Sequence, residues 1–501
     1  MSPQARGGLA AFAALGAVAL GGCVGSSDEA PSPAGVPSAA VGPAGGLNVV
    51  VVLTDDQEPG SLRVMDTVRR ELVAKGTSFE HAYATLPQCC PSRATLLTGQ
   101  YAHNNGVRGN EPELGGYAHL DNSETIATWL DDAGYSTAWV GKFLNGYGEP
   151  DKSQVSGEAA LTDVPEGWDR WWAPVDHSEA MMYGYALNEN GVVRRYGTEE
   201  ADYQTDLLAR KASGFVSEAA GGEEPFLLVV APTAPHKESD TRVGPSLTPR
   251  RDPRPAARHL GAFADEPLPR PPSFADSDLT DQPLARRLAA KYAGKPHGLS
   301  VPELLTSYRS RLESLLAVDD LVGRLLAELR RSGELERTLV IFTSDQGFVL
   351  GEHGLVGKQL PYEESARVPL VVRGPGIDAD RKVEVPVGNV DLAPTIVDAA
   401  NADAGIEMDG ISLLGAMRRG ADPAPRPILL EAFEELPFAA LRTPRGDAYL
   451  ETGRGEVELY DLDADPYELR NLAGLPRYEA REDRLAARLS ELRECAGASC
   501  R

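Results

Sequence analysis

Four short runs of apolar residues, rich in β-branched side chains, predict strands. They span residues 47–54, 226–230, 338–343 and 368–372. The first run, Leu-Asn-Val-Val-Val-Val-Leu-Thr, does not alternate polar and apolar positions, which is typical of a strand buried on both faces. Such strands occur in parallel sheets that carry helices on both faces. We therefore expect a sheet of this kind.

Helical periodicity separates these runs. Residues 65–75 and 304–331 place apolar side chains, such as Leu312 and Leu315, at helical spacing. Strands that alternate with helices predict an α/β fold, with a large, mostly parallel sheet flanked by helices. Residues 245–272, rich in Pro and Arg, predict an irregular insertion.

The pattern changes near the C-terminus. A Pro-rich linker is predicted at residues 421–427, and a charged helix near residues 478–493. We expect a catalytic domain over residues 47–425 and a small antiparallel sheet subdomain over residues 426–501. Its strand-like segments are residues 428–430, 448–451 and 458–462.

The N-terminus resembles a bacterial lipoprotein signal. An apolar segment, residues 9–20, is too short to span a bilayer and ends in Leu-Gly-Gly-Cys, a lipobox-like sequence. We expect residues 1–22 to be removed and Cys23 to carry a lipid, with a plain secretion signal as the alternative. Residues 23–46, rich in Gly, Ser, Pro and Ala, predict a flexible tether. The protein is then exported and held at the outer face of the cell membrane by its lipid alone, or secreted.

The chain has 501 residues and a formal net charge of −25. This charge argues against nucleic acid as a partner, because phosphate backbones are bound by clustered Lys and Arg. An acidic protein that binds an anion must do so locally, with a metal ion or a few cationic side chains.

The chain has five cysteines. In an exported protein Cys495 and Cys500 are expected to close a small disulfide loop, with two free thiols as the alternative. Cys90 is expected to be a buried thiol.

Cys89 stands at the start of a predicted helix. Pro91 suits the first helical turn, and residues 92–97 can continue it. Free backbone N–H groups and the helix dipole favour an anion at that place. Arg93 can point back towards the same site. The alternative is a buried Cys-Cys pair beside a helix cap.

Acidic residues follow two predicted strands. Asp55 and Asp56 come after the first strand, and Asp345 comes after the third. Ligands of α/β sheets bind beyond the carboxyl ends of the strands, so these residues lie where a site is expected. Adjacent carboxylates are stabilised by a cation, although a helix N-cap pair is the alternative.

Residues 89–99, Cys-Cys-Pro-Ser-Arg-Ala-Thr-Leu-Leu-Thr-Gly, resemble the sulfatase signature Cys-x-Pro-Ser-Arg-x-x-x-Leu-Thr-Gly. The resemblance extends over residues 48–501 and implies an alkaline-phosphatase-like fold. It also implies that a formylglycine-generating enzyme oxidises Cys89 to Cα-formylglycine, whose hydrated aldehyde is the nucleophile. Within the family, the chain most resembles N-acetylglucosamine-6-sulfatases, through stretches that include residues 53–57, 141–145, 316–321, 372–377 and 495–501.

The resemblance implies a metal site and a set of cationic residues. Ca²⁺, or else Mg²⁺, would be held by oxygen ligands. Those ligands would come from Asp55, Asp56, Cys89 after its oxidation, Asp345 and Gln346. Family members usually have Asn or His where this chain has Gln346. The implied catalytic residues are Cys89, Arg93, Lys142, His236 and Lys358.

Three further residues are of interest near these segments. Asn145 stands where sulfatases commonly have a His that contacts the leaving group, so this contact would come from Asn145 or differ altogether. His103 is a weaker candidate for lining the pocket, and His353 is expected on the surface or in a loop.

The implied reaction is hydrolysis of sulfate esters, of sulfated sugars or aryl sulfates, to an alcohol and inorganic sulfate. Asp345 would deprotonate the nucleophile, and His236 or Lys358 would protonate the leaving alcohol. The expected partners are a sulfated small molecule or glycan and the formylglycine-generating enzyme. Two other hypotheses stay open: a phosphonate monoester or phosphodiester hydrolase of the same superfamily, and a non-catalytic lipoprotein that binds sulfated glycans.

Overall fold

The computed structural model describes residues 46–238, 252–274, 279–291, 300–434 and 436–501. The predicted signal peptide, the lipidation site and nearly all of the tether fall outside these residues, as does the start of the predicted insertion. From residue 252 onward the insertion is irregular apart from one 3-10 turn, Ala257–His259. No helix among the described residues is both long and apolar enough to cross a bilayer.

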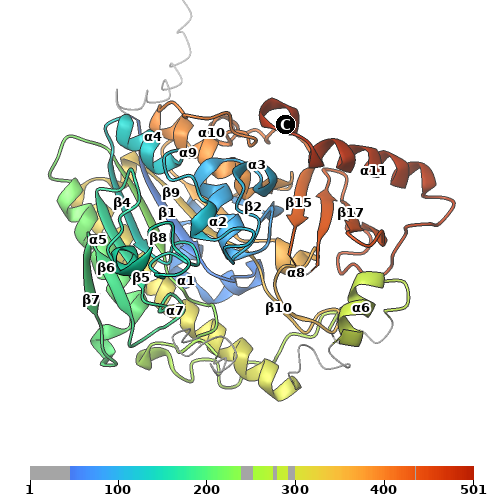
Figure 1. The fold of residues 1–501 in the computed structure, drawn as a ribbon, viewed down its shortest axis with the longest axis horizontal. Coiled ribbons are helices and arrows are strands. Elements are labelled where there is room, and N and C mark those ends of the chain that lie inside the picture. Colours follow the sequence, from blue (N-terminus) through green and yellow to red (C-terminus); the bar gives the residue numbers. More distant parts are fainter. Residues whose placement is uncertain (1–45, 239–251, 275–278, 292–299, 435) are drawn as a thin grey trace, which may run out of the picture. The chain divides into compact units, whose positions relative to one another are not determined.

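A ten-stranded mixed sheet organises the larger part of the chain, before the C-terminal segment (Figure 1). Its five central strands are parallel to one another, which confirms the predicted mostly parallel sheet. The central strands, in sheet order, are β9 (Thr338–Ser344), β1 (Asn48–Thr54), β8 (Phe226–Ala231), β4 (Ser136–Gly141) and β5 (Arg170–Val175). On one side the sheet continues through β12 (Leu370–Arg373), β2 (Thr77–Phe79) and β13 (Arg381–Val383), and on the other through β6 (Ala186–Glu189) and β7 (Val192–Arg195). The fourth predicted strand is β12, which runs antiparallel to β9 and β2.

Strand β1 is buried on both faces, as its sequence predicts. Val49, Val51 and Leu53 pack in one hydrophobic cluster, whereas Val50 and Val52 pack in another. The first cluster lies under α2 (Cys89–Thr98), α4 (Ile126–Asp132) and α9 (Leu392–Ala400), and the second under α1 (Asp66–Glu71), α5 (Gln204–Ala219) and α7 (Val301–Ser332). Each face of the sheet therefore has its own core, which is why the strand sequence does not alternate.

Of the two predicted helices, the structure confirms the longer one in full and the shorter one only in part. The longer one is α7, which begins with a capping box between Ser300 and Glu303. The shorter one is only partly correct, because α1 ends at Glu71 and a 3-10 turn, Val73–Lys75, follows. The chain then passes close to the sheet at Gly76, where an added Cβ would lie 2.4 Å from the carbonyl oxygen of Val372. A continued helix could not make this approach.

The C-terminal part forms a four-stranded antiparallel sheet covered by a helix, as predicted. Its elements are β15 (Ile428–Ala432), β16 (Phe438–Arg442), β17 (Asp447–Thr452), β18 (Val457–Asp461) and α11 (Glu479–Arg493). Strand β16 was not predicted, since its sequence, Phe-Ala-Ala-Leu-Arg, has few residues that favour strands. Cys495 and Cys500 form the predicted disulfide.

His103 ties this C-terminal part to the helices around Cys89. It lies on α3 (Ala102–Asn105), with Nδ1 2.7 Å from Oε1 of Glu431 and Nε2 3.0 Å from the carbonyl oxygen of Cys495. Both ring nitrogens are therefore engaged with the C-terminal part, and these contacts give His103 a structural role.

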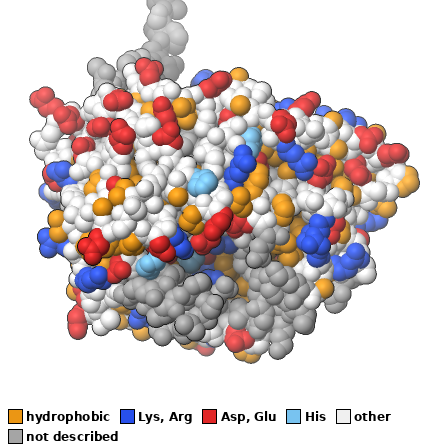
Figure 2. Space-filling view, in the orientation of Figure 1, with side chains coloured by type: hydrophobic (Ala, Val, Ile, Leu, Met, Phe, Trp, Pro, Cys, Tyr) orange, Lys and Arg blue, Asp and Glu red, His pale blue; other side chains and the backbone are white. Residues whose placement is uncertain are grey.

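Acidic and basic side chains are interspersed over the face drawn in Figure 2. A large net negative charge therefore does not prevent local cationic sites.

Candidate active site

The carboxyl ends of four adjacent parallel strands bring the predicted site residues together. The site residues at these strand ends are Asp55 and Asp56 after β1, Asp345 and Gln346 after β9, Lys142 after β4 and His236 beyond β8. Cys89 comes from the first residue of α2, and Lys358 follows the short strand β11 (Val356–Gly357). This is the edge at which α/β sheets bind their ligands.

Cys89 lies at the centre of the group. Its Sγ is 2.8 Å from Nζ of Lys358, 3.6 Å from Nζ of Lys142, 3.6 Å from Nε2 of Gln346 and 3.7 Å from Oδ1 of Asp55. The residue is 1% exposed. Burial raises the pKa of the Cys89 thiol, and the carboxylate of Asp55 raises it further, despite the two lysines. Position 89 as cysteine is therefore a protonated thiol.

The start of α2 offers fewer free donors than its sequence suggests. The N–H of Cys90 donates to Oδ1 of Asn110 at 3.0 Å, and Pro91 has no N–H. The expectation that free backbone N–H groups would supply the first contacts to an anion is therefore wrong for these two residues. The ammonium groups of Lys142 and Lys358 are the donors that lie beside Cys89 instead.

Arg93 points back from α2 into the site and is fully buried. Its Nε lies 2.9 Å from Oδ2 of Asp345, its Nη2 3.3 Å from Oδ2 of Asp55, and its Nη1 2.6 Å from the carbonyl oxygen of Lys142. All of these partners belong to the site. Arg93 therefore offsets the buried carboxylates and fixes their positions.

The carboxylates are also linked to one another. Oδ1 of Asp345 accepts the backbone N–H of Asp56 at 3.1 Å. Oδ1 of Asp56 accepts from Nζ of Lys358 at 2.7 Å and from Nε2 of Gln346 at 2.6 Å. Asp55 pairs with Lys142. The acidic and cationic groups thus form one connected network.

The network shifts the pKa values of two carboxyl groups in opposite directions. Burial alone would raise the pKa of Asp55, but Lys142 and the other cations hold it far below its usual range. Burial and the charge of Asp55 raise the pKa of Asp345 to about 6, despite Arg93. Asp55 therefore stays ionised, whereas Asp345 can exchange a proton near neutral pH. Carboxyl groups with separated pKa values are typical of acid–base sites.

The site also has the features of a metal site. Ligand atoms of Asp55, Asp56, Cys89 and His236 lie within 4.8 Å of one another. Oδ2 of Asp56 and Oε1 of Gln346 are buried and have no hydrogen-bond partner among the described residues. Buried oxygens of this kind are costly unless they are bound, and a half-turn of the Gln346 amide would direct its oxygen at Asp56. The carboxylate and amide oxygens fit a hard divalent cation such as Ca²⁺ or Mg²⁺.

His236 is neutral in this arrangement. Its Nδ1 lies 2.6 Å from the carbonyl oxygen of Lys237, so Nδ1 carries the proton and Nε2 is an acceptor. Burial lowers the pKa of His236 to about 3, outweighing Asp55 and Asp56. Of the two proton donors considered from the sequence, Lys358 is charged here, since burial alone would lower its pKa but nearby carboxylates raise it, whereas Nε2 of His236 carries no proton.

A comparison with protein families decides the classification. Residues 47–402 match the family model described as Sulfatase. The chain belongs to the sulfatase family.

Relatives within this family cover most of the chain. It is 31% identical to the N-acetylglucosamine-6-sulfatase of Homo sapiens over 500 residues, which is 91% of this chain and 86% of that protein. It is 32% identical to the arylsulfatase of Volvox carteri, over 90% of this chain and 75% of that protein. It is also 36% identical to the putative extracellular sulfatase Sulf-1 homolog of Caenorhabditis elegans, but the match spans only 48% of that longer protein.

Solved structures share the sulfatase fold. BT4656, in complex with its substrate D-glucosamine-2-N,6-O-disulfate, has a TM-score of 0.73 and 26% identity, over 90% of this chain and 98% of that chain. The phosphonate monoester hydrolase of Agrobacterium radiobacter has a TM-score of 0.69 and 21% identity, over 89% of this chain and 95% of that chain. The second likeness shows the fold alone.

Arg311 is a site residue of this sulfatase that the sequence analysis missed. It is 3% exposed and donates to the carbonyl oxygen of Asp56, to Oε2 of Glu58 at 2.9 Å and to the carbonyl oxygen of Pro235 at 3.3 Å. It therefore holds the loops after β1 and β8 together. One signal was present: Arg311 lies at a position of α7 where the helical period calls for an apolar residue.

Glu434 is a second residue that supports the site and that the sequence did not reveal. Its carboxylate accepts from Nε2 of Gln88 at 2.8 Å, from Nε2 of Gln359 at 2.9 Å and from the backbone N–H of Asn110 at 3.1 Å. It thus links the segments that precede Cys89 and follow Lys358. No local sequence pattern marks this contact, because it joins residues far apart in the chain.

Two remaining predictions concern Asn145 and His353. The backbone N–H of Asn145 donates to Sγ of Cys90 at 2.9 Å. Cys90 is a buried free thiol, as expected. His353 lies in a turn, which agrees with the predicted loop, but it is fully buried and is therefore not a surface residue. It stacks on Tyr362 with ring centroids 4.2 Å apart, which explains its burial.

Proposed function

We propose that this chain hydrolyses sulfate esters of sugars to an alcohol and inorganic sulfate. The observation that carries the proposal is the position of Cys89, within 3.6 Å of the ammonium groups of both Lys142 and Lys358. A sulfate ester at this position would have its oxygens beside two cations and its sulfur beside residue 89. Fixed charges aimed at the reacting group are the main source of catalysis in such sites.

The proposal includes conversion of Cys89 to formylglycine by a generating enzyme. A protonated thiol is a poor nucleophile, and the environment of Cys89 raises its pKa rather than lowering it. Once it has added water, the formylglycine aldehyde would supply two hydroxyl groups. One attacks sulfur, and loss of the proton from the other re-forms the aldehyde as the C–O bond to sulfate breaks.

The proposed metal is Ca²⁺ or Mg²⁺. Asp55, Asp56, Asp345, Gln346 and residue 89 would hold it. When bound, the ion supplies Lewis-acid chemistry and orients the substrate.

The surrounding side chains have distinct tasks in this proposal. Asp345, with a pKa of about 6, accepts the proton of the attacking hydroxyl. Lys358 is 18% exposed and is positioned to give a proton to the leaving alcohol, whereas Lys142 is 2% exposed and balances Asp55. Arg93 keeps Asp55 and Asp345 in place.

The proposed substrate is a 6-O-sulfated glucosamine at the end of a glycan. It is supported by the likeness to the human N-acetylglucosamine-6-sulfatase and to BT4656 with its disulfated glucosamine. The N-terminal anchor stays a proposal of its own, and mass spectrometry of the mature N-terminus would test whether Cys23 carries a lipid.

The first experiment is peptide mass spectrometry of residue 89 in protein from its native host, together with activity assays. We expect the mass of the aldehyde rather than the thiol, and turnover of a 6-O-sulfated glucosamine. Cys89→Ala should abolish turnover and Cys90→Ala should not, because Cys90 faces Asn145 rather than the site. Active protein with an unmodified Cys89 would overturn the mechanism. A panel of aryl sulfate, aryl phosphonate and bis-aryl phosphate would reveal the phosphonate or phosphodiester alternative.

A further inference from the structure

A second group of metal-type ligands lies outside the site around Cys89. His353 lies in the turn after β10 (Val349–Leu350), Glu364 lies on α8 (Glu363–Ala366), and Glu468 lies between β18 and α11. One ligand atom from each of the three residues lies within 4.8 Å of the other two. The group joins the catalytic part of the chain to its C-terminal part.

The imidazole of His353 is aimed into this group. The side chain is 0% exposed, and its Nδ1 lies 3.1 Å from Oε1 of Gln282, an oxygen that accepts a hydrogen bond from the Nδ1–H. Its Nε2 has no hydrogen-bond partner within the described ranges and lies 3.8 Å from Oε2 of Glu364. That oxygen is also buried without a hydrogen-bond partner there. A histidine that binds a metal typically has its other nitrogen held by an acceptor in this way.

Glu468 is buried and is held in place by two donors. Its Oε1 lies 3.1 Å from Nη2 of Arg442, and its Oε2 accepts the backbone N–H of Glu363 at 2.9 Å. A carboxylate has about four lone-pair sites, so these contacts leave acceptor capacity for a cation.

We propose that His353, Glu364 and Glu468 bind a transition-metal dication, for which Zn²⁺ is the best match. One imidazole nitrogen and two carboxylates form a donor set suited to Zn²⁺, whereas Ca²⁺ and Mg²⁺ prefer oxygen ligands alone. Ligand atoms of a tetrahedral site with bonds of about 2.1 Å lie about 3.4 Å apart. The 3.8 Å between Nε2 of His353 and Oε2 of Glu364 needs only a small closure to reach that value.

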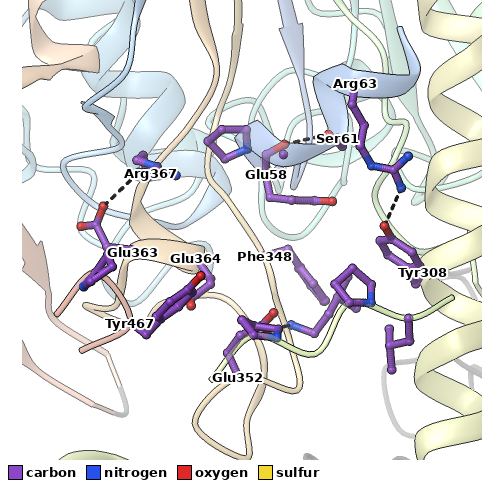
Figure 3. A pocket seen from close by; sticks show the side chains of 17 residues that line it. Glu58, Ser61, Arg63, Tyr308, Phe348, Glu352, Glu363, Glu364, Arg367 and Tyr467 are labelled. Carbon is purple, nitrogen blue, oxygen red and sulfur yellow. Dashed lines mark hydrogen bonds and ion pairs between the residues drawn. The ribbon is translucent and has the colours of Figure 1, made fainter. Parts of the chain in front are cut away.

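The site has a route for the ion to enter. Glu364 lies on the wall of a pocket of about 560 Å³ that also includes Glu352, Tyr467 and Phe348 (Figure 3). Three protein ligands leave a fourth position for water or for a ligand. The bound ion would join α8, the turn at His353 and the C-terminal segment at Glu468.

Zn²⁺ titration of the full chain tests this proposal independently of its sulfatase activity. Protein carrying Cys89→Ala is stripped of metal, saturated with Ca²⁺ to occupy the site at Asp55 and Asp56, and titrated with Zn²⁺ by calorimetry. We expect one equivalent of Zn²⁺ to bind and the thermal midpoint to rise, because the ion binds the folded state. Failure of this protein to bind Zn²⁺ would overturn the proposal and leave the group as a buried imidazole–carboxylate cluster.

His353→Asn locates the ion. Asn keeps an N–H donor near the place of Nδ1 and removes Nε2. Zn²⁺ affinity should fall by more than about 100-fold, since losing even a supporting residue of a metal site costs 10- to 100-fold. His119→Asn is the matched control, because His119 is exposed and contacts the carbonyl oxygen of Pro112. Glu364→Gln provides the same comparison if the first variant does not fold, and unchanged Zn²⁺ binding in either variant would refute the assignment.

Discussion

Nζ of Lys358 lies 2.8 Å from Sγ of Cys89, and the lysine side chain is 18% exposed. Lys142 also contacts Cys89, at 3.6 Å, but it is 2% exposed and paired with Asp55. The two lysines therefore differ in what they can do. Lys358 is partly accessible to solvent, whereas Lys142 belongs to the buried interior of the site.

We expect Lys358→Met to lower kcat/KM for a 6-O-sulfated glucosamine by about 10²- to 10³-fold, the usual cost of removing one group that stabilises the transition state. The variant should fold, because the lysine is partly exposed. Lys142→Met should instead destabilise the protein by about 3 kcal/mol or more, since it removes one partner of a buried ion pair. Steady-state kinetics and urea unfolding measure the two effects. Lys382→Met, at an exposed residue, is the control. Full activity of Lys358→Met would exclude this lysine from catalysis.

Metal affinity should fall as the pH drops below about 6. Asp345 has a pKa of about 6 in the metal-free protein, so it is protonated below that pH and must lose the proton to bind a cation. Binding near this pH should release a proton, which calorimetry detects as a heat that depends on the buffer. Asp345→Asn should bind metal more weakly and lose this proton release. An affinity that does not change across this range would contradict the assignment of Asp345.

His103 should stabilise the protein more at acidic than at alkaline pH. Burial alone would lower its pKa, but the hydrogen bond to Glu431 raises it above the ordinary value of 6.5. A raised pKa means that the protonated ring is favoured in the folded state. The stabilisation is therefore complete below pH 6.5 and is lost as the pH rises through the folded-state pKa.

Urea unfolding of wild type and His103→Gln at both ends of this range measures the difference. We expect it to be about 1.5–3 kcal/mol at the acidic end, the usual contribution of a hydrogen bond to a charged group, and smaller at the alkaline end. His119→Gln, at an exposed histidine, should show no such trend. A difference that grows with pH would contradict the role given to Glu431.

We expect Arg311→Met to impair the active site, although Arg311 acts by positioning other residues and not by contacting the substrate. Its loss leaves the carbonyl oxygens of Asp56 and Pro235 without this donor, so the metal ligand Asp56 should become misplaced. We expect weaker Ca²⁺ binding and a lower kcat, together with a loss of about 3–5 kcal/mol in the free energy of unfolding. Arg309→Met on the same helix is the control, because Nε of Arg309 donates to the carbonyl oxygen of Glu266 rather than to a site residue. Wild-type Ca²⁺ affinity in Arg311→Met would rule out this positioning role.

Local patterns predicted the sheet and most of the candidate site. The uninterrupted apolar run of β1 indicates burial on both faces, and the acidic residues that follow β1 and β9 mark the edge where ligands bind. The motif at Cys89 predicted the start of α2. These features could be found in the sequence because strand burial, strand ends and helix starts depend on neighbouring residues.

Other features could not be found in this way. The contact of Arg311 with Asp56 joins residues 255 positions apart, and Glu434 reaches segments more than 300 positions away, next to Cys89. The neutral state of His236 depends on its burial and on a backbone carbonyl. The sequence by itself therefore predicted the residues that gather around Cys89 and the edge of the sheet on which they lie, but neither Arg311 nor Glu434. Only the tertiary structure decided which of them are charged, exposed or held in place, because burial and electrostatic fields arise from groups that folding brings together.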